Sequence, residues 1–375
     1  MLAVISVRAT ADIMGLWLDS PSGRNNPFDP KNTQSHTLPF PTNTQIQSQT
    51  ITPTFSISPT FSSSPTISKT YTSSPTFTPS PTASPTPLLG QDWVNVTASP
   101  PFGARTEASC VTFSSKLWFL GGANGVVGFK NDVWSTTDGI TWNQATASAG
   151  WSVRQGPGVA AFNGKLWVVG GEFGLYYNDV WSSSDGAIWT RNTPGAAFSP
   201  RKYMQCLSYN GYLWGIGGYN GSTFYNDVWK SADGITWTLV TPSAAFSPRD
   251  LHQTLVFGGA MWVISGGSSV TGDVADVWTS TDGATWTLAT GSPGFTGREF
   301  FGAAVLNGKM WVYGGSDGSN RRDVWNSPDG VSWTLVADPA TFTACSGFGS
   351  AAFNGSLWLI GGYNGSYLAQ VWRSP

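Results

Sequence analysis

The chain has 375 residues, only 11% of them charged, and a formal net charge of -2 at pH 7. Nucleic acids and anionic membranes require a basic face on their partner, so this charge balance argues against both classes of ligand. No apolar run approaches the ~18 residues that a membrane-spanning helix needs, and the three cysteines, Cys110, Cys206 and Cys345, match neither a disulfide framework nor a zinc-binding spacing.

Residues 1–90 form the first segment, in which proline, serine and threonine are concentrated. The triplet Ser-Pro-Thr recurs at 58–60, 64–66, 74–76, 80–82 and 84–86. Frequent proline removes amide donors and favours an extended chain, and the segment has too little apolar surface to offset its conformational entropy. We therefore expect a disordered Ser/Thr/Pro-rich arm or linker at 1–90.

The composition of this arm also bears on localisation. Dense Ser and Thr with Pro is typical of O-glycosylated stalks on exported proteins, which predicts an extracellular or cell-surface location. The start of the chain shows no clear signal peptide, because Arg8 and Asp12 break up its mildly apolar beginning. An unmodified linker is the alternative interpretation of the arm.

Residues 91–375 contain one pattern repeated six times. The valine of an Asp-Val-Trp motif, or of its variant, recurs at Val133, Val180, Val228, Val277, Val324 and Val371. A Gly-Gly pair recurs at 121–122, 170–171, 217–218, 266–267, 314–315 and 361–362. A repeat of this length indicates four strands per unit. In the third unit we expect strands at 201–209, 212–216, 227–231 and 236–240, joined by Asn-Gly, variable and Asp-Gly connections.

The sixth unit ends at Pro375 without a fourth strand, and a matching strand precedes the first unit. Residues 92–96, Asp-Trp-Val-Asn-Val, match 236–240 of the third unit. This predicts that the N-terminal strand completes the last blade and closes the ring, which removes an open sheet edge that would invite aggregation. The predicted fold is therefore all-β: a six-bladed β-propeller of four-stranded antiparallel blades at 91–375, closed by the N-terminal strand and preceded by the disordered arm.

Almost every large aromatic residue of this region has an equivalent in each repeat. With Trp93 included, tryptophans occupy three sixfold columns. A fourth column of large aromatics precedes each predicted first strand: Phe102, Trp151, Phe198, Phe246, Phe295 and Phe342. Large apolar side chains at such regular positions are interpreted as core packing rather than as ligand contacts.

The repeat resembles the kelch repeat of the galactose oxidase/kelch superfamily. The clearest copy runs from Gly217-Gly218-Tyr219 through Asn226-Asp227-Val228-Trp229 to Trp237, and the six copies extend over 91–375. The hairpin after Asp-Val-Trp is shorter than is usual in kelch repeats. Its sequence, Asp-Gly-Ile-Thr-Trp at 138–142, also resembles the Asp-box of sialidases but is one residue short, so we interpret it as a tight turn.

Catalytic chemistry has few candidate residues here. Galactose oxidase, which the fold resembles, holds copper with histidines and tyrosines, but this chain has only His36, in the arm, and His252, which we interpret as a packed strand residue. We therefore predict no metal, no cofactor and no catalytic residue. Paired carboxylates such as Asp250 and Glu299 leave open an alternative, a carbohydrate-active enzyme of the isomerase or lyase type, so the sequence does not decide whether the protein is an enzyme.

Five repeats have an arginine at the start of the first strand and an aspartate before Val-Trp. The sixth repeat has lost both, with Cys345 and Gln370 in their places. Joint loss suggests that the two residues serve each other, which predicts same-blade structural pairs: Arg105 with Asp132, Arg154 with Asp179, Arg201 with Asp227, Arg249 with Asp276, and Arg298 with Asp323. In peptide-binding kelch domains, which this chain resembles, such arginines hold acidic ligands, and an anion-binding arginine ring is the alternative.

The connections between the second and third strands vary most between repeats, as binding loops on rigid scaffolds do. Their candidate binding residues, with the charged residues that follow three of the arginines, are Tyr176, Tyr177, Tyr219, Tyr225, Arg321, Arg322, Tyr363, Tyr367, Lys202, Asp250 and Glu299. Some of the tyrosines have the alternative role of covering the Gly-Gly pairs. We expect a monomeric, non-catalytic module that recognises a protein or glycan ligand through these and the neighbouring loops, with a purely structural surface protein as a further alternative.

Overall fold

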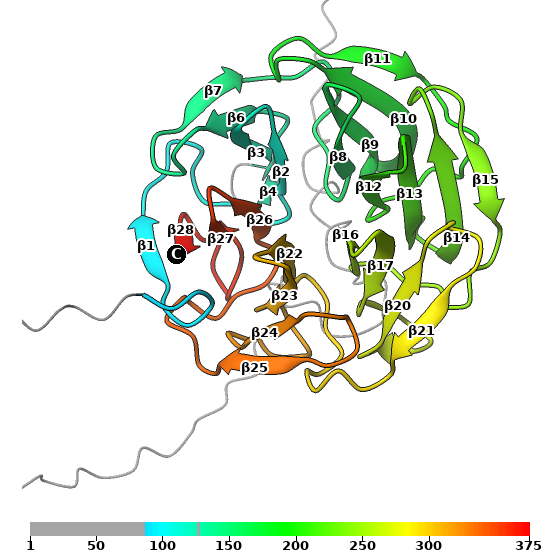
Figure 1. Ribbon diagram of the computed structural model, residues 1–375. Coiled ribbons are helices and arrows are strands. Elements are labelled where there is room, and N and C mark those ends of the chain that lie inside the picture. The colour runs from blue at the N-terminus through cyan, green and yellow to red at the C-terminus, as the bar shows by residue number, and fades with distance from the viewer. Residues whose placement is uncertain (1–86, 126–127) are drawn as a thin grey trace, which may run out of the picture. The chain divides into compact units, whose positions relative to one another are not determined.

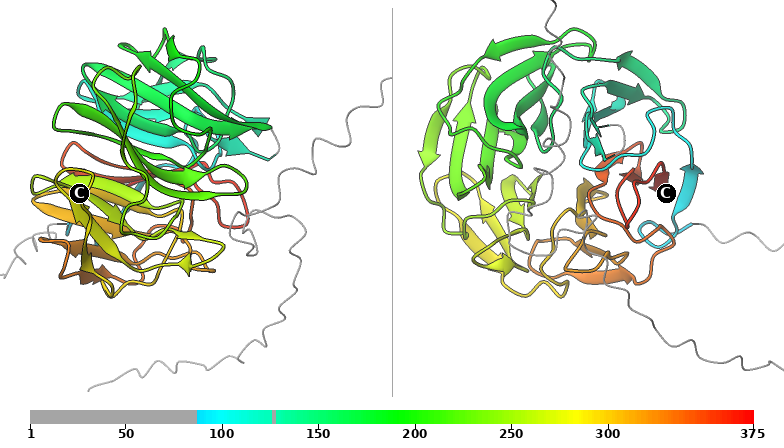
Figure 2. Two further views of the ribbon diagram at one scale, coloured as in Figure 1. Left: turned by 90° about the vertical axis from the view of Figure 1, so that its right-hand side faces the viewer. Right: turned by 180° about the vertical axis from the view of Figure 1, so that it is seen from behind.

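The computed structural model describes residues 87–125 and 128–375, so the predicted arm lies outside the described residues except at its end. The described chain is all-β and forms six four-stranded antiparallel sheets arranged as blades around an axis (Figure 1). Figure 2 shows the ring of blades edge-on and from behind. None of the described residues forms a helix that is long and apolar enough to cross a membrane.

Each blade uses its strands in the same radial order, from the axis outwards (Figure 1). The innermost strands, here called strands a of blades one to six, are β2 (Ser109–Phe113), β8 (Gly158–Phe162), β12 (Gln205–Tyr209), β16 (Gln253–Phe257), β22 (Gly302–Leu306) and β26 (Gly349–Phe353). Strands b are β3 (Lys116–Leu120), β9 (Lys165–Phe173), β13 (Tyr212–Tyr219), β17 (Ala260–Ile264), β23 (Lys309–Tyr313) and β27 (Ser356–Ile360). Strands c are β6 (Val133–Thr136), β10 (Leu175–Ser183), β14 (Phe224–Ser231), β20 (Val277–Ser280), β24 (Val324–Ser327) and β28 (Val371–Ser374).

The outermost strands, strands d, complete the blades. They are β7 (Asn143–Thr146), β11 (Thr190–Thr193), β15 (Thr238–Thr241), β21 (Thr287–Thr290), β25 (Thr334–Ala337) and, in blade six, β1 (Val94–Thr97). Two short hairpins extend the b–c connections of blades one and four: β4 (Ala123–Asn124) with β5 (Gly128–Phe129), and β18 (Gly267–Ser268) with β19 (Gly272–Asp273).

Blades two and three differ from the sequence-based expectation at their b–c connections. The sequence predicts a variable loop after Gly-Gly, but β9 and β10 continue pairing beyond Gly171 to a tip where Leu175 faces Phe173.

Strand a of blade three begins at Gln205 rather than at Arg201, because Tyr203 adopts a left-handed backbone conformation (φ 57°) that a continuous strand does not tolerate.

The turn between strands c and d is held by two side chains. In blade three, the Ser231 hydroxyl accepts the Gly234 amide at 2.8 Å, and Asp233 Oδ1 accepts the amides of Ile235 and Thr236, each at 2.8 Å. The Thr236 amide bond is the largest cause of a pKa of Asp233 below its usual range. This arrangement agrees with the interpretation of Asp-Gly as a tight turn.

Neighbouring blades interlock through this same turn. The strand-b tryptophan of one blade packs on the turn glycine of the next, and a Cβ added to Gly234 would lie 2.0 Å from Trp167. The equivalent pairs are Gly186 with Trp118, Gly283 with Trp214, Gly330 with Trp262, Gly90 with Trp311, and Gly139 with Trp358. The cycle of contacts is therefore complete around the ring, and only glycine leaves room for the indole at these turns.

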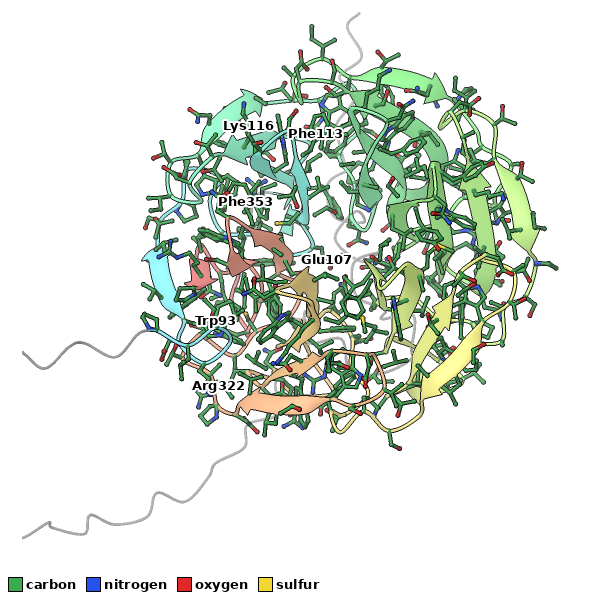
Figure 3. The ribbon with its side chains drawn as sticks, viewed as in Figure 1. Trp93, Glu107, Phe113, Lys116, Arg322 and Phe353 are labelled. Atoms are coloured by element: carbon green, nitrogen blue, oxygen red, sulfur yellow. The ribbon has the colours of Figure 1, made fainter. Side chains whose placement is uncertain are left out.

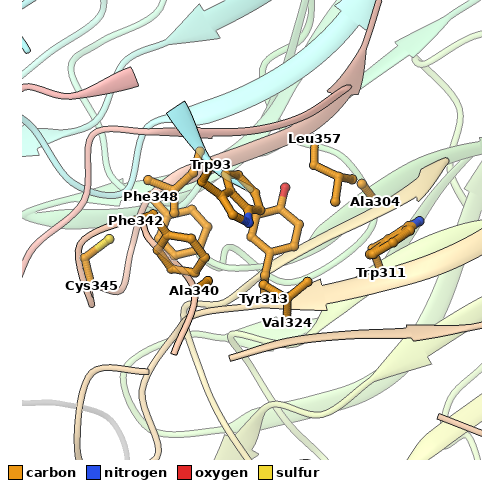
Figure 4. Close-up of a cluster of buried hydrophobic side chains, with 11 residues drawn as sticks. Trp93, Ala304, Trp311, Tyr313, Val324, Ala340, Phe342, Cys345, Phe348 and Leu357 are labelled. Atoms are coloured by element: carbon orange, nitrogen blue, oxygen red, sulfur yellow. The ribbon is translucent and has the colours of Figure 1, made fainter. Parts of the chain in front are cut away.

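The N-terminal strand closes the ring, as the sequence predicts. Strand β1 pairs antiparallel with β28, with Val94 opposite Arg373 (Figure 1). Trp93 is 5% exposed and packs between blades five and six, with its ring centroid 4.9 Å from that of Phe342 and 5.3 Å from that of Tyr313 (Figure 4). The closing segment thus supplies core as well as hydrogen bonds.

The closing segment starts slightly before residue 91. The Gly90 amide donates to Ser374 Oγ at 2.6 Å, and the Trp93 indole donates to the Gly90 carbonyl at 3.0 Å. These bonds reproduce the c–d turn of the other blades, with Ser374 in the place of Ser231. Leu89 also packs against the core cluster of blades five and six, so residues 88–90 are part of the propeller.

Candidate functional site

The structure contains all five same-blade Arg–Asp pairs. In blade five, Arg298 donates from Nη1 to Asp323 Oδ1 at 2.7 Å and from Nη2 to Oδ2 at 2.8 Å. Nη1 also donates to the Gly314 carbonyl at 3.0 Å, and the Trp325 indole donates to Asp323 Oδ2 at 2.8 Å. The other pairs repeat this geometry: Arg105–Asp132, Arg154–Asp179, Arg201–Asp227 and Arg249–Asp276.

Blade six replaces the ion pair with a neutral equivalent. Gln370 Nε2 donates to the Gly361 carbonyl at 3.1 Å, which is the bond that the guanidinium makes elsewhere, and lies 3.5 Å from Cys345 Sγ. Gln370 Oε1 accepts the Trp372 indole at 2.7 Å, as the aspartate does in the other blades. The joint loss of arginine and aspartate therefore has a direct structural reason, because each residue's hydrogen bonds are taken over by an uncharged group.

These arginines are unsuited to hold a ligand. Their exposed fractions are 2% or less, and each guanidinium is bonded to carboxylate and carbonyl oxygens of its own blade. Two of the candidate loop tyrosines cover them: the Tyr177 ring centroid is 4.4 Å from Arg154 Cζ, and the Tyr225 ring centroid is 3.6 Å from Arg201 Cζ. Tyr177 and Tyr225 thus have a packing role that the sequence left open as an alternative.

Six residues, one from each blade, form a layer near the axis that we call the floor, and each lies two residues after the arginine of its blade or, in blade six, after Cys345. The residues at this position all have left-handed backbones, with φ between 54° and 66°: Glu107, Gly156, Tyr203, Leu251, Phe300 and Gly347. Glu107 Oε2 accepts the Tyr203 hydroxyl at 2.7 Å, which joins blade one to blade three. The Tyr203 ring in turn packs edge-on against Phe300 of blade five, with their ring centroids 5.9 Å apart. Figure 3 shows Glu107 near the centre of the ring of blades. Left-handed non-glycine residues are strained, and such strain concentrates at functional sites.

A cavity of about 150 Å³ adjoins this floor. The four side chains of the floor line it together with strand-a residues that include Ser109, Gln205, Gln253 and Ser350. The lining combines polar and apolar side chains and contains no arginine or lysine.

Charged residues from several blades gather at the level of the floor, and we call Glu107, Glu172, Lys202, Asp250 and Glu299 the axial cluster. Lys202, Asp250 and Glu299 directly follow the arginines of blades three, four and five. Each forms an isolated antiparallel β-bridge with a residue at or just beyond the end of strand b of its own blade: Lys202 with Tyr219, Asp250 with Gly267, and Glu299 with Ser316. Lys202 Nζ lies 3.5 Å from Glu172 Oε2. The structure thus brings together three of the charged residues that the sequence suggested, and adds Glu107 and Glu172.

Burial perturbs the acids of this cluster. Burial first, and the charge of Glu299 second, raise the pKa of Asp250 well above its usual range, and Lys202 opposes the shift. Burial also raises the pKa of Glu107, against the hydrogen bond from Tyr203 and the charge of Lys202. A buried pair of acids of this kind is either a functional site or a structural charge network.

The remaining candidate tyrosines lie on the b–c face, which carries the b–c connections. The ring centroids of Tyr176 in blade two and Tyr219 in blade three are 6.4 Å apart, and those of Tyr363 and Tyr367 in blade six are 5.2 Å apart. Arg321 Nη2 donates to Asp317 Oδ2 at 2.6 Å, so the Arg321 guanidinium is paired within its own b–c loop. For Arg322 the structure shows a backbone bond from Ala340 to its carbonyl.

Sequence reasoning missed two apolar residues of the same face, Phe173 and Leu175. Phe173 contacts Phe129 of blade one at 5.0 Å and is partly exposed, while Leu175 is 72% exposed at the hairpin tip. Two ring pairs, Phe129 with Phe173 and Tyr176 with Tyr219, thus connect the β9–β10 hairpin to blades one and three, and we call these four residues the aromatic row. The signal was present in the sequence, since these residues fall in the variable segments, but only the tertiary contacts show that they adjoin.

His252 is packed and buried as expected, but it lies directly before strand a of blade four rather than within it. It is fully buried near Gly217 and Gly266. Burial first, and the charge of Arg249 second, lower the pKa of His252 to about 3. Across the described parts of the chain, no group of three or more His, Cys, Asp or Glu side chains could hold a metal ion.

Sequence comparison agrees with this geometry. A family model for the kelch motif matches residues 344–373, which comprise strands a, b and most of c of blade six. The chain is a six-bladed kelch-type β-propeller. Kelch propellers bind proteins, so the propeller is indicated as a protein-interaction module. A search of curated proteins finds no match to the chain.

Proposed function

We propose that this kelch propeller is a non-catalytic binding module, displayed outside the cell, that recognises a protein through its b–c and d–a loops. The observation that carries the proposal is the aromatic row with Leu175 at its edge, in which Phe173 and Leu175 are exposed beside the half-buried rings of Phe129, Tyr176 and Tyr219. Aromatic residues on such a surface are favoured interface residues.

Exposed apolar residues on the opposite face make a weaker candidate. Ile140, Ile188, Ile235 and Val331 are exposed at the c–d turns, one on each of blades one, two, three and five. Because these turns repeat around the ring, their apolar side chains are separated by a blade width, and scattered single apolar residues are normal on protein surfaces. The b–c face is therefore the better interface.

The position of the closing segment supports display. Residues 88–90 form the c–d turn of blade six, and c–d turns lie at the strand ends opposite the b–c connections. A chain that continues from residue 87 towards an anchor therefore starts on the face away from the aromatic row. The Ser/Thr/Pro-rich composition of residues 1–86 suits a spacer of this kind.

An array of peptides, proteins and glycans probed with the full chain tests the proposal. Leu175→Ser should abolish the selected interaction, while the matched change Ile188→Ser, at a 76% exposed turn residue of the other face, should preserve it. Equal loss in both variants, or retention in both, would contradict the assignment to the b–c face. Selection of glycans alone would make the aromatic rings a sugar-stacking surface instead.

Catalysis is the second candidate function, and the Asp250–Glu299 pair is the observation that favours it. One carboxyl with a strongly raised pKa beside a second acid is the arrangement used for acid/base work on sugars. Incubation of the full chain with the glycans of the array, followed by chromatography, tests this function. Turnover that Glu299→Gln abolishes would replace the non-catalytic proposal.

A further inference from the structure

The carboxyls of the axial cluster outnumber its cation. Lys202 is at salt-bridge distance from Glu172, and the described residues contain no corresponding bridge from Lys202 to Asp250. Glu299 occupies the next blade at the position equivalent to Asp250, so the two acids are neighbours around the axis. Asp273, on the b–c hairpin of blade four, adds a further negative charge that acts on Asp250.

Asp250 is the residue whose surroundings leave most unsatisfied. It is 3% exposed, and within the described chain its Oδ2 has no hydrogen-bond partner. It occupies the same position in its blade as Lys202 and Glu299 do in the neighbouring blades, and the charges of both residues act on it. A buried carboxylate oxygen without a donor is costly, and a native protein retains one where a water, an ion or a ligand supplies the donor or where the group has a function.

The aromatic row borders the axial cluster directly. Tyr176 lies opposite Glu172 in the β9–β10 hairpin, and Lys202 and Tyr219 exchange both backbone hydrogen bonds at 2.9 Å. The rings of Tyr176 and Tyr219 contact each other at this border. A cationic group on a partner that docks on the row would therefore meet aromatic faces first and carboxylates next, and both attract cations.

We propose that the axial cluster is a specificity site for a cationic nitrogen group, the ammonium of lysine or the guanidinium of arginine, presented by the protein that docks on the aromatic row. Asp250 Oδ2 accepts an N–H of this group, and Glu299 supplies the second negative charge. Lys202 holds Glu172 in place and repels cations from that side, which directs the group to Asp250. This inference rests on the proposed function and names the chemistry that its partner must carry.

Titration calorimetry of the full chain with blocked peptides Gly-Ser-X-Ser-Gly tests the proposal, where X is Lys, Arg, Gln or Glu. We expect the Lys or Arg peptide to bind at least about 10-fold more tightly than the Gln peptide, and binding to weaken with added salt. Asp250→Asn and Glu299→Gln should each remove this preference. Asp92→Asn removes the same charge from an exposed residue beside the c–d turn of blade six, on the opposite face, and should leave the preference intact.

Asp250→Asn also provides its own folding control. Its desolvated acid is neutralised, so the variant should melt at or above the temperature of the wild type at pH 7, and a loss of binding cannot then be ascribed to unfolding. Equal binding of the Lys, Arg and Gln peptides would overturn the proposal, as would a preference that survives Asp250→Asn. Stoichiometric Ca²⁺ binding that Asp250→Asn abolishes, without any peptide preference, would overturn it in favour of a metal.

Failure of the proposed function can be distinguished from failure of this inference. If an array-selected protein binds through Leu175 but is indifferent to Asp250→Asn, the interaction module stands and the cation-binding site does not. If the Lys or Arg peptide binds and the array selects no protein, the cation-binding site stands and the assignment of a protein partner is withdrawn.

Discussion

Blade six suggests an experiment on the buried ion pairs, because it shows the neutral arrangement that the fold accepts. We consider transplanting this arrangement into blade five as Arg298→Cys with Asp323→Gln. Arg298→Cys alone leaves Asp323 buried with the Trp325 indole as its remaining side-chain donor, and it removes the bond to the Gly314 carbonyl. Removing one partner of a buried pair costs about 3–5 kcal/mol of unfolding free energy.

The double variant should cost much less than the sum of its parts. In blade six the glutamine bonds both the glycine carbonyl and the indole, so the glutamine that Asp323→Gln introduces has the means to satisfy Gly314 and Trp325 in the same way. What remains is the volume lost from Arg298, which packs on Phe295 with its Cζ 5.5 Å from the ring centroid. We expect a loss of about 1–2 kcal/mol for the double variant, and hence a coupling of at least ~2 kcal/mol between the two positions.

Urea unfolding followed by tryptophan fluorescence measures the four unfolding free energies of this cycle. Arg191→Cys serves as the control, because Arg191 lies exposed on β11, donates to the Pro194 carbonyl at 3.3 Å and has its Cζ 5.8 Å from the Trp181 ring centroid, so its loss should cost less than about 1 kcal/mol. Additive losses from Arg298→Cys and Asp323→Gln would refute the argument that blade six carries a neutral equivalent of the pair.

Three further changes test the ring and its core. Trp93→Ala should cost ~3–5 kcal/mol in urea unfolding, as for other buried large aromatics, and wild-type stability would contradict closure by the N-terminal strand. Gly234→Ala should lower the melting temperature far more than Gly211→Ala, because both glycines have φ near 75° but only the first would press a Cβ into Trp167. His252→Leu should stabilise the protein progressively relative to the wild type as pH falls from about 6.5 towards 4, since the wild-type histidine has a pKa depressed to about 3 when folded and binds a proton only on unfolding; a pH-independent difference would place that histidine in water.

The sequence determined those features that repeat. A period of valine, Gly-Gly and tryptophan sites indicates four-stranded units whatever their packing, and the match of 92–96 to 236–240 predicts how the ring closes. Even the Arg–Asp pairs were predictable, because both partners vanish together in blade six. Each of these inferences needs only comparison between copies of one local pattern, in which neighbouring strands come from neighbouring residues.

Only the tertiary structure decided what happens at the axis. The left-handed backbone of Tyr203 gives no signal in its residue type, since tyrosine does not favour that conformation, and it makes strand a of blade three begin later than predicted. Glu107 and Tyr203 are 96 residues apart, and their hydrogen bond depends on how closely six blades approach the axis. That distance is set by the packing of tryptophan on glycine between all the blades at once, so no single repeat contains the information that assembles the floor and the axial cluster.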